Sequence, residues 1–368
     1  MHKSLRAMLF MGLVCFVATG LSSSNPPDRS LDAPALPDGA NPALSTMTYN
    51  IKGLPWPLDF NRDAALARIA ERLRAMRDRR QQPHIVLLQE AFTPQAGTIA
   101  RASGYPYMAF GPDRTLRSSV ASVEADRAFL DQARWDRGER MGKQVDSGLI
   151  ILSDYPITRV QRLAFPDFAC AGFDCLANKG VLIAELQVPG EVEPVAIVNM
   201  HLNSRKASGV PVQRSLTAYA RQVDMAARFI ASAVPDTRPL MIGGDMNIGR
   251  GADRGRAFFD SFSRHGLSFV TAPQSGARLA LRSAKVPTEL GRADLMHATQ
   301  RRKDWIFARA GQGAAMVVKG AHVPFGSEAE GPPLSDHFGY VIGYDRDGRR
   351  RDQLALVDGR VLPNAAYR

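Results

Sequence analysis

The sequence has little of several features that would place it in a specialised class of protein. It contains only three cysteines in 368 residues, and there is neither a thiolate cluster nor a His-x-x-x-His spacing typical of zinc sites. Its 31 glycines and 24 prolines are too few for collagen or low-complexity disorder, and no internal repeat is present. No apolar run reaches the roughly 20 residues of an ordinary membrane-spanning helix, which excludes a polytopic membrane protein. The remaining class is a globular protein of ordinary composition, and because large sheet-based enzymes form single domains of up to about 250–300 residues, we expect one domain plus tails.

Positive charge is in excess in this sequence. Lysine and arginine number 47 against 36 acidic residues, which gives a formal net charge of +11. Such a balance favours an anionic partner, whether a polyanion, an anionic lipid surface or a phosphorylated substrate. Charge alone does not distinguish these partners.

The N-terminal segment has the pattern of a secretory signal. It opens with basic residues, continues with an apolar run over residues 7–18 and reaches small residues in Ala18-Thr19-Gly20. The pattern predicts a signal peptide over residues 1–20 and a secreted or periplasmic protein after its cleavage. An uncleaved membrane anchor is the alternative interpretation.

Two cysteines remain after the predicted leader. Cys170 and Cys175 are five positions apart, and export would favour a disulfide between them because thiols oxidise outside the cytosol. So short a loop loses little entropy on closure, and the bond would therefore rigidify a turn locally. Two free thiols are the alternative.

The rest of the chain divides into a linker, a folded domain and a tail. Residues 21–43 are rich in proline and poor in large apolar residues, which predicts a disordered linker. Residues 44–345 form the predicted domain, and residues 346–368 a basic C-terminal tail. Residues 113–143 are charged and are either a helical insertion or a mobile loop.

Short apolar or β-branched runs dominate the predicted domain. Strands are predicted over residues 46–51, 84–89, 147–152, 180–188, 195–201, 240–244, 304–308, 315–323 and 337–344. Helical periodicity appears in residues 66–76 and 216–230, and more weakly in residues 254–264. Many strands with few helices, and no strict βαβ alternation, predict an α/β protein with stacked sheets flanked by helices.

Polar side chains recur where these strands begin or end, at positions from which a sheet can hold them rigidly at the rim of a cleft. The candidates are Asn50, Glu90, His201, Asp245 with Asn247, Asp304, and Asp336 with His337. Carboxylate and amide oxygens are ligands that Mg²⁺ prefers, and imidazole transfers protons near neutral pH. The set predicts a divalent-cation site beside a general base.

The order of these motifs resembles the endonuclease/exonuclease/phosphatase superfamily, which has the fold of DNase I. The most specific elements are Gly-Gly-Asp-Met-Asn at 243–247 and Ser-Asp-His at 335–337, with Gln-Glu at 89–90 and Asn-Met-His-Leu at 199–202. The resemblance implies a four-layered α/β/β/α sandwich with two mostly antiparallel sheets, and a catalytic domain over residues 44–345. It also implies a metal-dependent hydrolase that acts on phosphoester bonds, with Mg²⁺ as the expected ion and Mn²⁺ or another divalent cation as the alternative.

Carried over to this sequence, the resemblance assigns a role to each candidate residue. The metal ligands would be Glu90 and Asn50, with Asp336 at a second metal. His337 would be the general base oriented by Asp304. The remaining residues would position water or phosphate: Asp245 and Asn247, and His201 if it is protonated.

The segment over residues 170–182 resembles the Asp-x-x-x-Asn-Lys-Gly stretch of secreted neutral sphingomyelinases, which would place Asn178 and Lys179 near the phosphate. A lipid headgroup is therefore favoured as substrate over nucleic acid, with a peripheral membrane contact and a monomeric chain.

A second interpretation rests on seven basic residues that could track a nucleic-acid backbone as in a secreted nuclease, or could simply form a solvated loop: Arg278, Arg282, Lys285, Arg292, Arg301, Arg302 and Lys303. A phosphomonoesterase or a catalytically silent lipid- or polyanion-binding module is the third. Trp56 is the best candidate for an exposed apolar contact.

Overall fold

The computed structural model describes residue 42 and residues 44–54, 62–311 and 316–346. The predicted signal peptide, almost all of the predicted linker, Trp56 and all but the first residue of the basic tail lie outside these described residues. Within them, no helix combines the length and apolar character that a membrane span requires.

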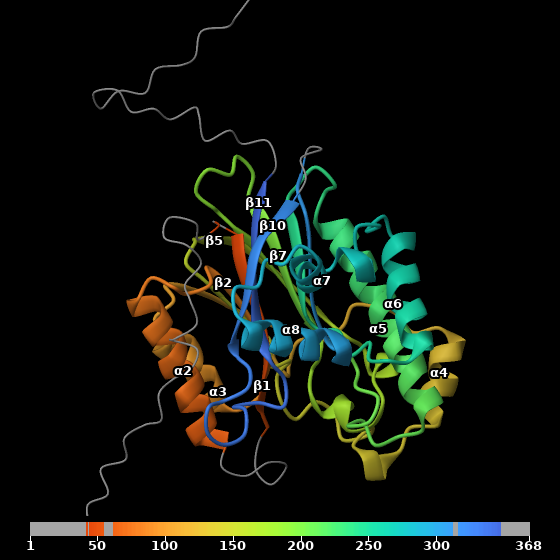
Figure 1. The fold of residues 1–368 in the computed structure, drawn as a ribbon. Helices are drawn as coiled ribbons and strands as arrows, with labels where there is room; N and C mark the ends of the chain where they lie inside the picture. Colours follow the sequence, from red (N-terminus) through yellow and green to blue (C-terminus); the bar gives the residue numbers. More distant parts are fainter. Residues whose placement is uncertain (1–41, 43, 55–61, 312–315, 347–368) are drawn as a thin grey trace, which may run out of the picture.

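In the described part of the chain, eleven strands form two sheets, which stack face to face between layers of helices (Figure 1). The first sheet comprises β1 (Leu44–Gly53), β2 (Ile85–Ala91), β3 (Tyr107–Phe110), β4 (Ile150–Ser153), β10 (Met316–Phe325) and β11 (Gly339–Arg346). The second comprises β5 (Ile157–Ala164), β6 (Gly180–Leu186), β7 (Val195–His201), β8 (Leu240–Asp245) and β9 (Asp304–Arg309). Their orders are β10-β11-β1-β2-β4-β3 and β5-β6-β7-β8-β9.

Helices cover both outer faces of the sandwich. They are α2 (Arg62–Asp78), α3 (Pro94–Ala102), α4 (Glu124–Asp131), α5 (Val212–Ala233), α6 (Ala252–Arg264), α7 (Gly276–Arg282) and α8 (Glu289–Arg301). Short 3₁₀ turns are η1 (Trp135–Arg137), η2 (Asp167–Ala169), η3 (Gly172–Leu176) and η4 (Ala272–Gln274). Helices α2 and α3 pack on the first sheet, α5 and α6 on the second, and α7 with α8 contact the edge strands β9 and β10. This confirms the predicted four-layered α/β/β/α sandwich.

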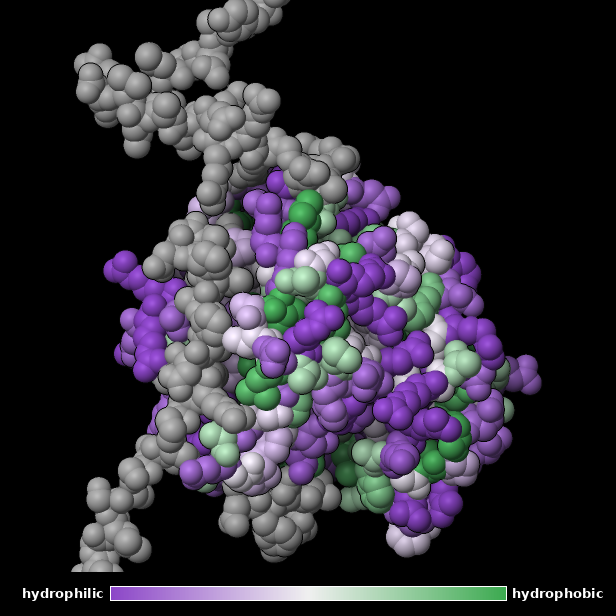
Figure 2. Space-filling model, in the orientation of Figure 1, coloured by the Kyte–Doolittle hydropathy of each residue, from purple (hydrophilic) through white to green (hydrophobic). Residues whose placement is uncertain are grey.

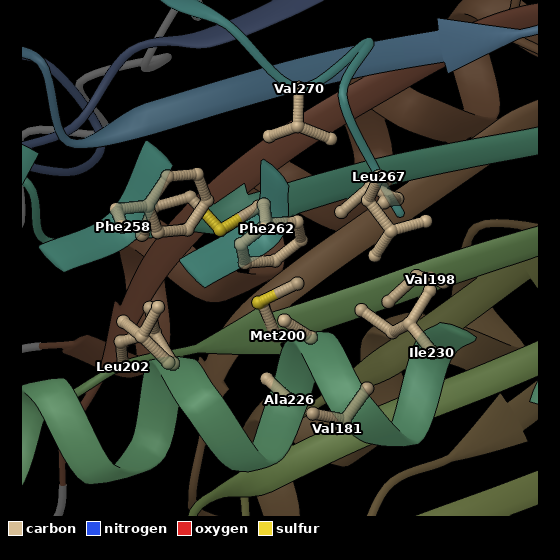
Figure 3. Packing of buried hydrophobic residues seen from close by; sticks show 14 of the residues in the cluster. Val181, Val198, Met200, Leu202, Ala226, Ile230, Phe258, Phe262, Leu267 and Val270 are labelled. Carbon is tan, nitrogen blue, oxygen red and sulfur yellow. The ribbon is translucent and has the colours of Figure 1, made fainter. Parts of the chain in front are cut away.

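The helical layers form where the sequence has apolar residues at helical spacing. In α2, Leu66, Ile69, Leu73 and Met76 are all buried against the first sheet, as their period predicts. On the opposite side, α5 and α6 pack on the second sheet through a cluster that includes Val198, Met200, Ile230, Phe258 and Phe262 (Figure 3). The outward faces of these helices are largely hydrophilic (Figure 2).

The structure adds elements that the sequence patterns did not predict. Strand β5 is an edge strand with much of its surface exposed, so it lacks the apolar run of a buried strand, and β3 has only four residues. The basic stretch before Asp304 forms α7 and α8 instead of a loop. Residues 113–143 contain α4 and η1, which favours the interpretation as a partly helical insertion.

Two parallel strand pairs determine where the polar strand ends meet. Among the described strands, only β1 with β2 and β7 with β8 run parallel; the other neighbouring pairs are antiparallel. Because parallel strands end at the same edge, each sheet gathers two carboxyl ends there, and this edge is at the bottom of Figure 1.

Buried contacts hold the two sheets close together near this edge. Asn199 on β7 donates a hydrogen bond to the carbonyl of Leu88 (2.8 Å), and its side-chain oxygen accepts one from Gln89 (2.8 Å). At Gly243 a Cβ atom would lie 2.5 Å from Leu87 of the other sheet. The Gln-Glu, Asn-Met-His and Gly-Gly-Asp motifs therefore also fix the distance between the sheets.

Candidate active site

The base of the site is one row of residues across the second sheet. His201, Asp245 and Asp304 are in register on β7, β8 and β9. Facing them from the first sheet are Asn50 on β1 and Glu90 on β2. The structure thus brings together residues that are far apart in the sequence, from Asn50 to Asp304.

Glu90 and Asp245 form the acidic part of the site, and Asn50 lies between them. The Asn50 amide nitrogen donates to Glu90 Oε1 (2.8 Å) and to Asp245 Oδ2 (3.1 Å). Glu90, His201 and Asp245 each offer a ligand atom within 4.8 Å of the others. Burial raises the pKa of Glu90, because its carboxylate loses water without gaining a full counter-charge. Oxygen donors in this setting fit a divalent cation.

The orientation of Asn50 differs from the predicted ligand role. Its side-chain oxygen accepts a hydrogen bond from the Lys52 N–H (3.0 Å), so the amide presents NH₂ to the two carboxylates. Binding a cation through the oxygen would require the amide to turn over. In this conformation Asn50 instead bridges the two acids as a shared donor.

Two site residues have an unusual backbone conformation. Glu90 has a φ of 59° and Asn247 a φ of 47°, in the left-handed region that non-glycine residues rarely occupy. Such conformations cost on the order of 1–3 kcal/mol and persist where the surrounding structure enforces them. At Glu90 and Asn247 they turn the chain at the end of β2 and just beyond β8, where both side chains reach the cavity.

His337 and Asp304 form a buried pair. The His337 Nδ1 lies 2.8 Å from Asp304 Oδ2, and the His337 backbone N–H donates to Ser335 Oγ (3.2 Å). Ser335 in turn donates to the carbonyl of Asn50 (2.7 Å), which links the loop that carries His337 to the strand that carries Asn50. Burial alone would lower the pKa of His337, but Asp304 and Asp245 raise it to about 9. With Nδ1–H donated to Asp304, Nε2 is the nitrogen that exchanges a proton with the cavity.

The predicted phosphate contact of His201 was conditional on its protonation, and the surroundings of His201 disfavour the protonated form. Burial and the ammonium of Lys179, whose Nζ lies 3.1 Å from His201 Nε2, lower the pKa of His201 to about 3. The imidazole is therefore neutral near pH 7. The positive charge on this side of the site comes from Lys179, which also forms an ion pair with Asp174.

These residues line a cavity of about 470 Å³. Its polar lining residues are Lys52, Glu90, Gln144, Asp174, Lys179, His201, Ser204, Asp245, Asn247, Lys303, Asp336 and His337. Its apolar lining residues, which we call the apolar wall, are Leu54, Phe92, Val145, Phe173, Leu176, Ala177 and Ala207. Of these, sequence reasoning missed Lys52, Gln144, Asp174, Ser204 and most of the apolar wall, and it counted Lys303 only as part of a basic stretch. Lys303 Nζ lies 3.3 Å from His337 Nε2, and its position directly before Asp304 was the available signal.

Three predicted site residues have other surroundings. Asn178 was predicted to lie near the phosphate, but it is not among the cavity-lining residues, and its amide donates to the carbonyls of Asp113 (2.6 Å) and Leu116 (2.9 Å). Asp336 lines the cavity but is half-exposed, and its carboxylate lies 3.9 Å from Arg301 and in neither metal-ligand cluster of the described residues. Asn247 lines the cavity while its amide donates to the Leu202 carbonyl (3.0 Å).

A disulfide joins Cys170 and Cys175, with their Cα atoms 5.2 Å apart. It closes the turn that carries Phe173 and Asp174, which both line the cavity. The bond therefore constrains one lip of the site.

Comparison with known proteins agrees with this geometry. The model of the endonuclease/exonuclease/phosphatase family matches residues 47–337. The chain belongs to this family. It is 24% identical over 309 residues to a sphingomyelinase of Mycobacterium tuberculosis, covering 82% of this chain and 52% of that protein. It is 24% identical over 249 residues to sphingomyelinase C 2 of Leptospira interrogans, covering 64% of this chain and 35% of that protein.

The chain thus spans about half the length, or less, of these two relatives of the family. Among solved structures, a mutant of beta toxin from Staphylococcus aureus with bound magnesium ions superposes with a TM-score of 0.54 at 16% identity. That match covers 82% of this chain and 99% of the toxin, and it shows a shared fold.

Proposed function

We propose that this chain is a divalent-cation-dependent phosphodiesterase whose substrate is a lipid of the sphingomyelin class. The observation that carries the proposal is the shared cavity, in which Glu90 and Asp245 face His337 beside an apolar wall. The sphingomyelinases among its relatives support the lipid substrate.

In the proposed reaction, a water molecule attacks phosphorus and His337 takes its proton. The bond between phosphorus and the ceramide oxygen breaks, and His337 returns the proton to that leaving oxygen. Asp304 holds the Nδ1–H of the imidazole, so the lone pair of Nε2 is directed at the cavity. Lys179 and Lys303 supply positive charge to the phosphate oxygens from two sides. Asn247, at the turn just beyond β8, positions water or substrate.

Glu90 and Asp245 would hold the cation, joined by Asn50 if its amide turns over. Mg²⁺ is the proposed ion because it prefers oxygen ligands and retains several waters; Mn²⁺ is the alternative. When bound, the cation would polarise the phosphoryl group and stabilise the leaving oxygen.

The surroundings of the basic stretch favour lipid over nucleic acid. Several of these side chains donate to carbonyls of this chain: Arg282 to Pro273, Lys285 to Val318, Arg292 to Leu281 and Arg301 to Asp336. Arg278 lies over the ring of Trp305. Arginines engaged in this way are poorly placed to track a phosphate backbone, whereas the apolar wall suits an acyl or sphingoid chain.

The test compares two substrates under identical conditions. Purified protein with Mg²⁺ is given sphingomyelin, with release of phosphocholine measured, and supercoiled plasmid, with nicking measured. The proposal predicts phosphocholine release without comparable nicking. Nicking without phosphocholine release would instead establish a nuclease, and release of inorganic phosphate from a monoester alone would establish a phosphomonoesterase.

Glu90→Gln should weaken the response to Mg²⁺. Loss of a ligand charge is expected to raise the Mg²⁺ concentration for half-maximal activity by about 10- to 100-fold, a range typical of changes at metal sites. The measurement is a metal titration of activity for both proteins. Glu185→Gln is the matched control, since this buried carboxylate pairs with Arg238 at the other end of the sheet (3.0 Å). Overlapping titrations of wild type and Glu90→Gln would remove Glu90 as a ligand.

The proposal includes export after cleavage near residue 20. The leader pattern supports it, and the Cys170–Cys175 bond is of a kind that persists outside the cytosol. Mass spectrometry of the exported protein should find an N-terminus near Leu21 and a mass two hydrogens short across the cysteine pair. Retention of the leader would contradict cleavage and support the anchor interpretation.

A further inference from the structure

A second cluster of apolar side chains lies on the surface beside the cavity. Trp135 and Met141 leave 77% and 59% of their surface exposed, and Phe173 leaves 43%. Residues 134–144, which we call the rim loop, carry the first two. Exposed apolar residues are common singly, but grouped at the mouth of a site they indicate a contact with another surface.

The rim loop is held in place without using these side chains. Its backbone closes on itself through hydrogen bonds such as Gly138 N–H to the Trp135 carbonyl (3.1 Å). Its anchor is Glu139, whose buried carboxylate accepts from the Arg214 side chain (2.7 Å) and from the Gly172 N–H (2.8 Å). The anchoring leaves Trp135 and Met141 directed away from the protein interior.

The rim loop is part of the lip of the cavity. Gln144 lines the cavity, and Arg137 lies over the ring of Phe173, 5.8 Å from its centroid. A Cβ on Gly138 would lie 2.9 Å from Leu176, another lining residue. In Figure 1 the yellow segment that follows α4 lies at the bottom, where β1 also ends.

The rim loop carries more basic than acidic residues. Arg134, Arg137 and Arg140 lie on or near the surface, against one surface acid in the rim loop, Asp136, which pairs with Arg134 (2.7 Å) and lies 3.5 Å from Arg137. Glu139 is already neutralised by Arg214. Tryptophan is common at lipid–water boundaries, and arginine side chains there can reach lipid phosphates. The composition of the rim loop is therefore typical of a surface that contacts a membrane.

We infer that the rim loop docks the protein on a phospholipid bilayer, with Trp135 and Met141 entering the headgroup region. The inference rests on the proposed function, since a lipid substrate must reach the cavity from a membrane. The apolar wall that begins at Phe173 and Leu176 then continues from the bilayer toward the phosphate site. A nucleic acid is the less fitting partner, because Met141 offers no ring for a base to stack on.

The test measures binding to vesicles of phosphatidylcholine mixed with phosphatidylserine by sedimentation of the full chain. No divalent cation is added, so binding is measured apart from turnover. Trp135→Ala with Met141→Ala should lower the partition coefficient at least about tenfold. Tyr107→Ala is the matched control, because Tyr107 is an exposed aromatic residue far from the cavity. It is in register with Ser153, and Ser153 with Ile85, which begins β2 at the end of the sheet opposite the site.

A second readout separates docking from catalysis. With Mg²⁺ and a water-soluble phosphodiester, the double variant should keep wild-type turnover, while its turnover on vesicle-borne sphingomyelin falls. Wild-type sedimentation by the double variant would overturn the inference, as would weakened binding to a DNA oligonucleotide with vesicle binding unchanged. A third outcome is that the wild-type protein binds vesicles but hydrolyses no phosphodiester, while the double variant loses vesicle binding. That outcome would support the docking surface and overturn only the proposed function.

Discussion

His337→Ala is expected to lower turnover by about 10²- to 10⁴-fold while leaving the fold intact, because a positioned proton acceptor contributes a factor of this size. The imidazole is buried, but its partners are side chains of the site, so its loss should alter chemistry more than packing. The measurement is steady-state turnover with a thermal melt of each protein. His265→Ala is the matched control, since His265 forms a similar pair with Asp224 (2.9 Å) outside the cavity. Near-normal turnover of His337→Ala would remove its role as the base.

The pH dependence of an Asp304 variant gives a second test of His337 as the base. The base must be unprotonated to act, so activity should rise with pH as the imidazole loses its proton. Asp304 is the principal carboxylate that raises the pKa of His337 to about 9 in the cation-free chain. Asp304→Asn should therefore move the acidic limb of the pH–rate profile to lower pH, with a lower plateau because the imidazole is less well oriented. An unchanged limb would mean that another group sets it.

Asp245→Ala is expected to lower turnover by at least about 10²-fold. Asp245 belongs to both ligand clusters and accepts hydrogen bonds from Asn50 (3.1 Å) and the Asn247 N–H (3.0 Å). Removing it takes away charge that holds the cation and orients two neighbours, and each tenfold loss corresponds to about 1.36 kcal/mol of barrier. Asp224→Ala, at a carboxylate that pairs with a histidine elsewhere, is the control. Turnover within a few-fold of wild type at saturating Mg²⁺ would contradict this assignment.

The sequence predicted the core of the fold because buried strands and amphipathic helices have strong periodic patterns. It also predicted the gathering of Asn50, Glu90, His201, Asp245, Asp304 and His337, since all six stand at or beside the ends of strands. The parallel pairing of β1 with β2 and of β7 with β8 brings these ends together. Strand β5 was not predicted, because an exposed strand at the edge of a sheet needs no apolar run.

Other features of the site depend on contacts that a sequence pattern does not contain. Asn178 and Lys179 are adjacent, yet only Lys179 lines the cavity, because the Asn178 amide is bonded to the carbonyls of Asp113 and Leu116 while the Lys179 ammonium lies beside His201. The sequence left the protonation of His201 open, and only the structure shows that burial beside Lys179 lowers its pKa. The rim loop has no apolar period, and its exposed Trp135 is recognisable only once Glu139 is seen to anchor the loop.

The most direct test of the central claim is hydrolysis in ¹⁸O-labelled water by the purified chain, first without and then with Mg²⁺. The account predicts no turnover until the cation is added, and then one labelled oxygen in the phosphate-containing product, because water attacks phosphorus at the cavity that Glu90, Asp245 and His337 share. Turnover that is independent of any divalent cation, or label found in the released alcohol instead, would contradict it.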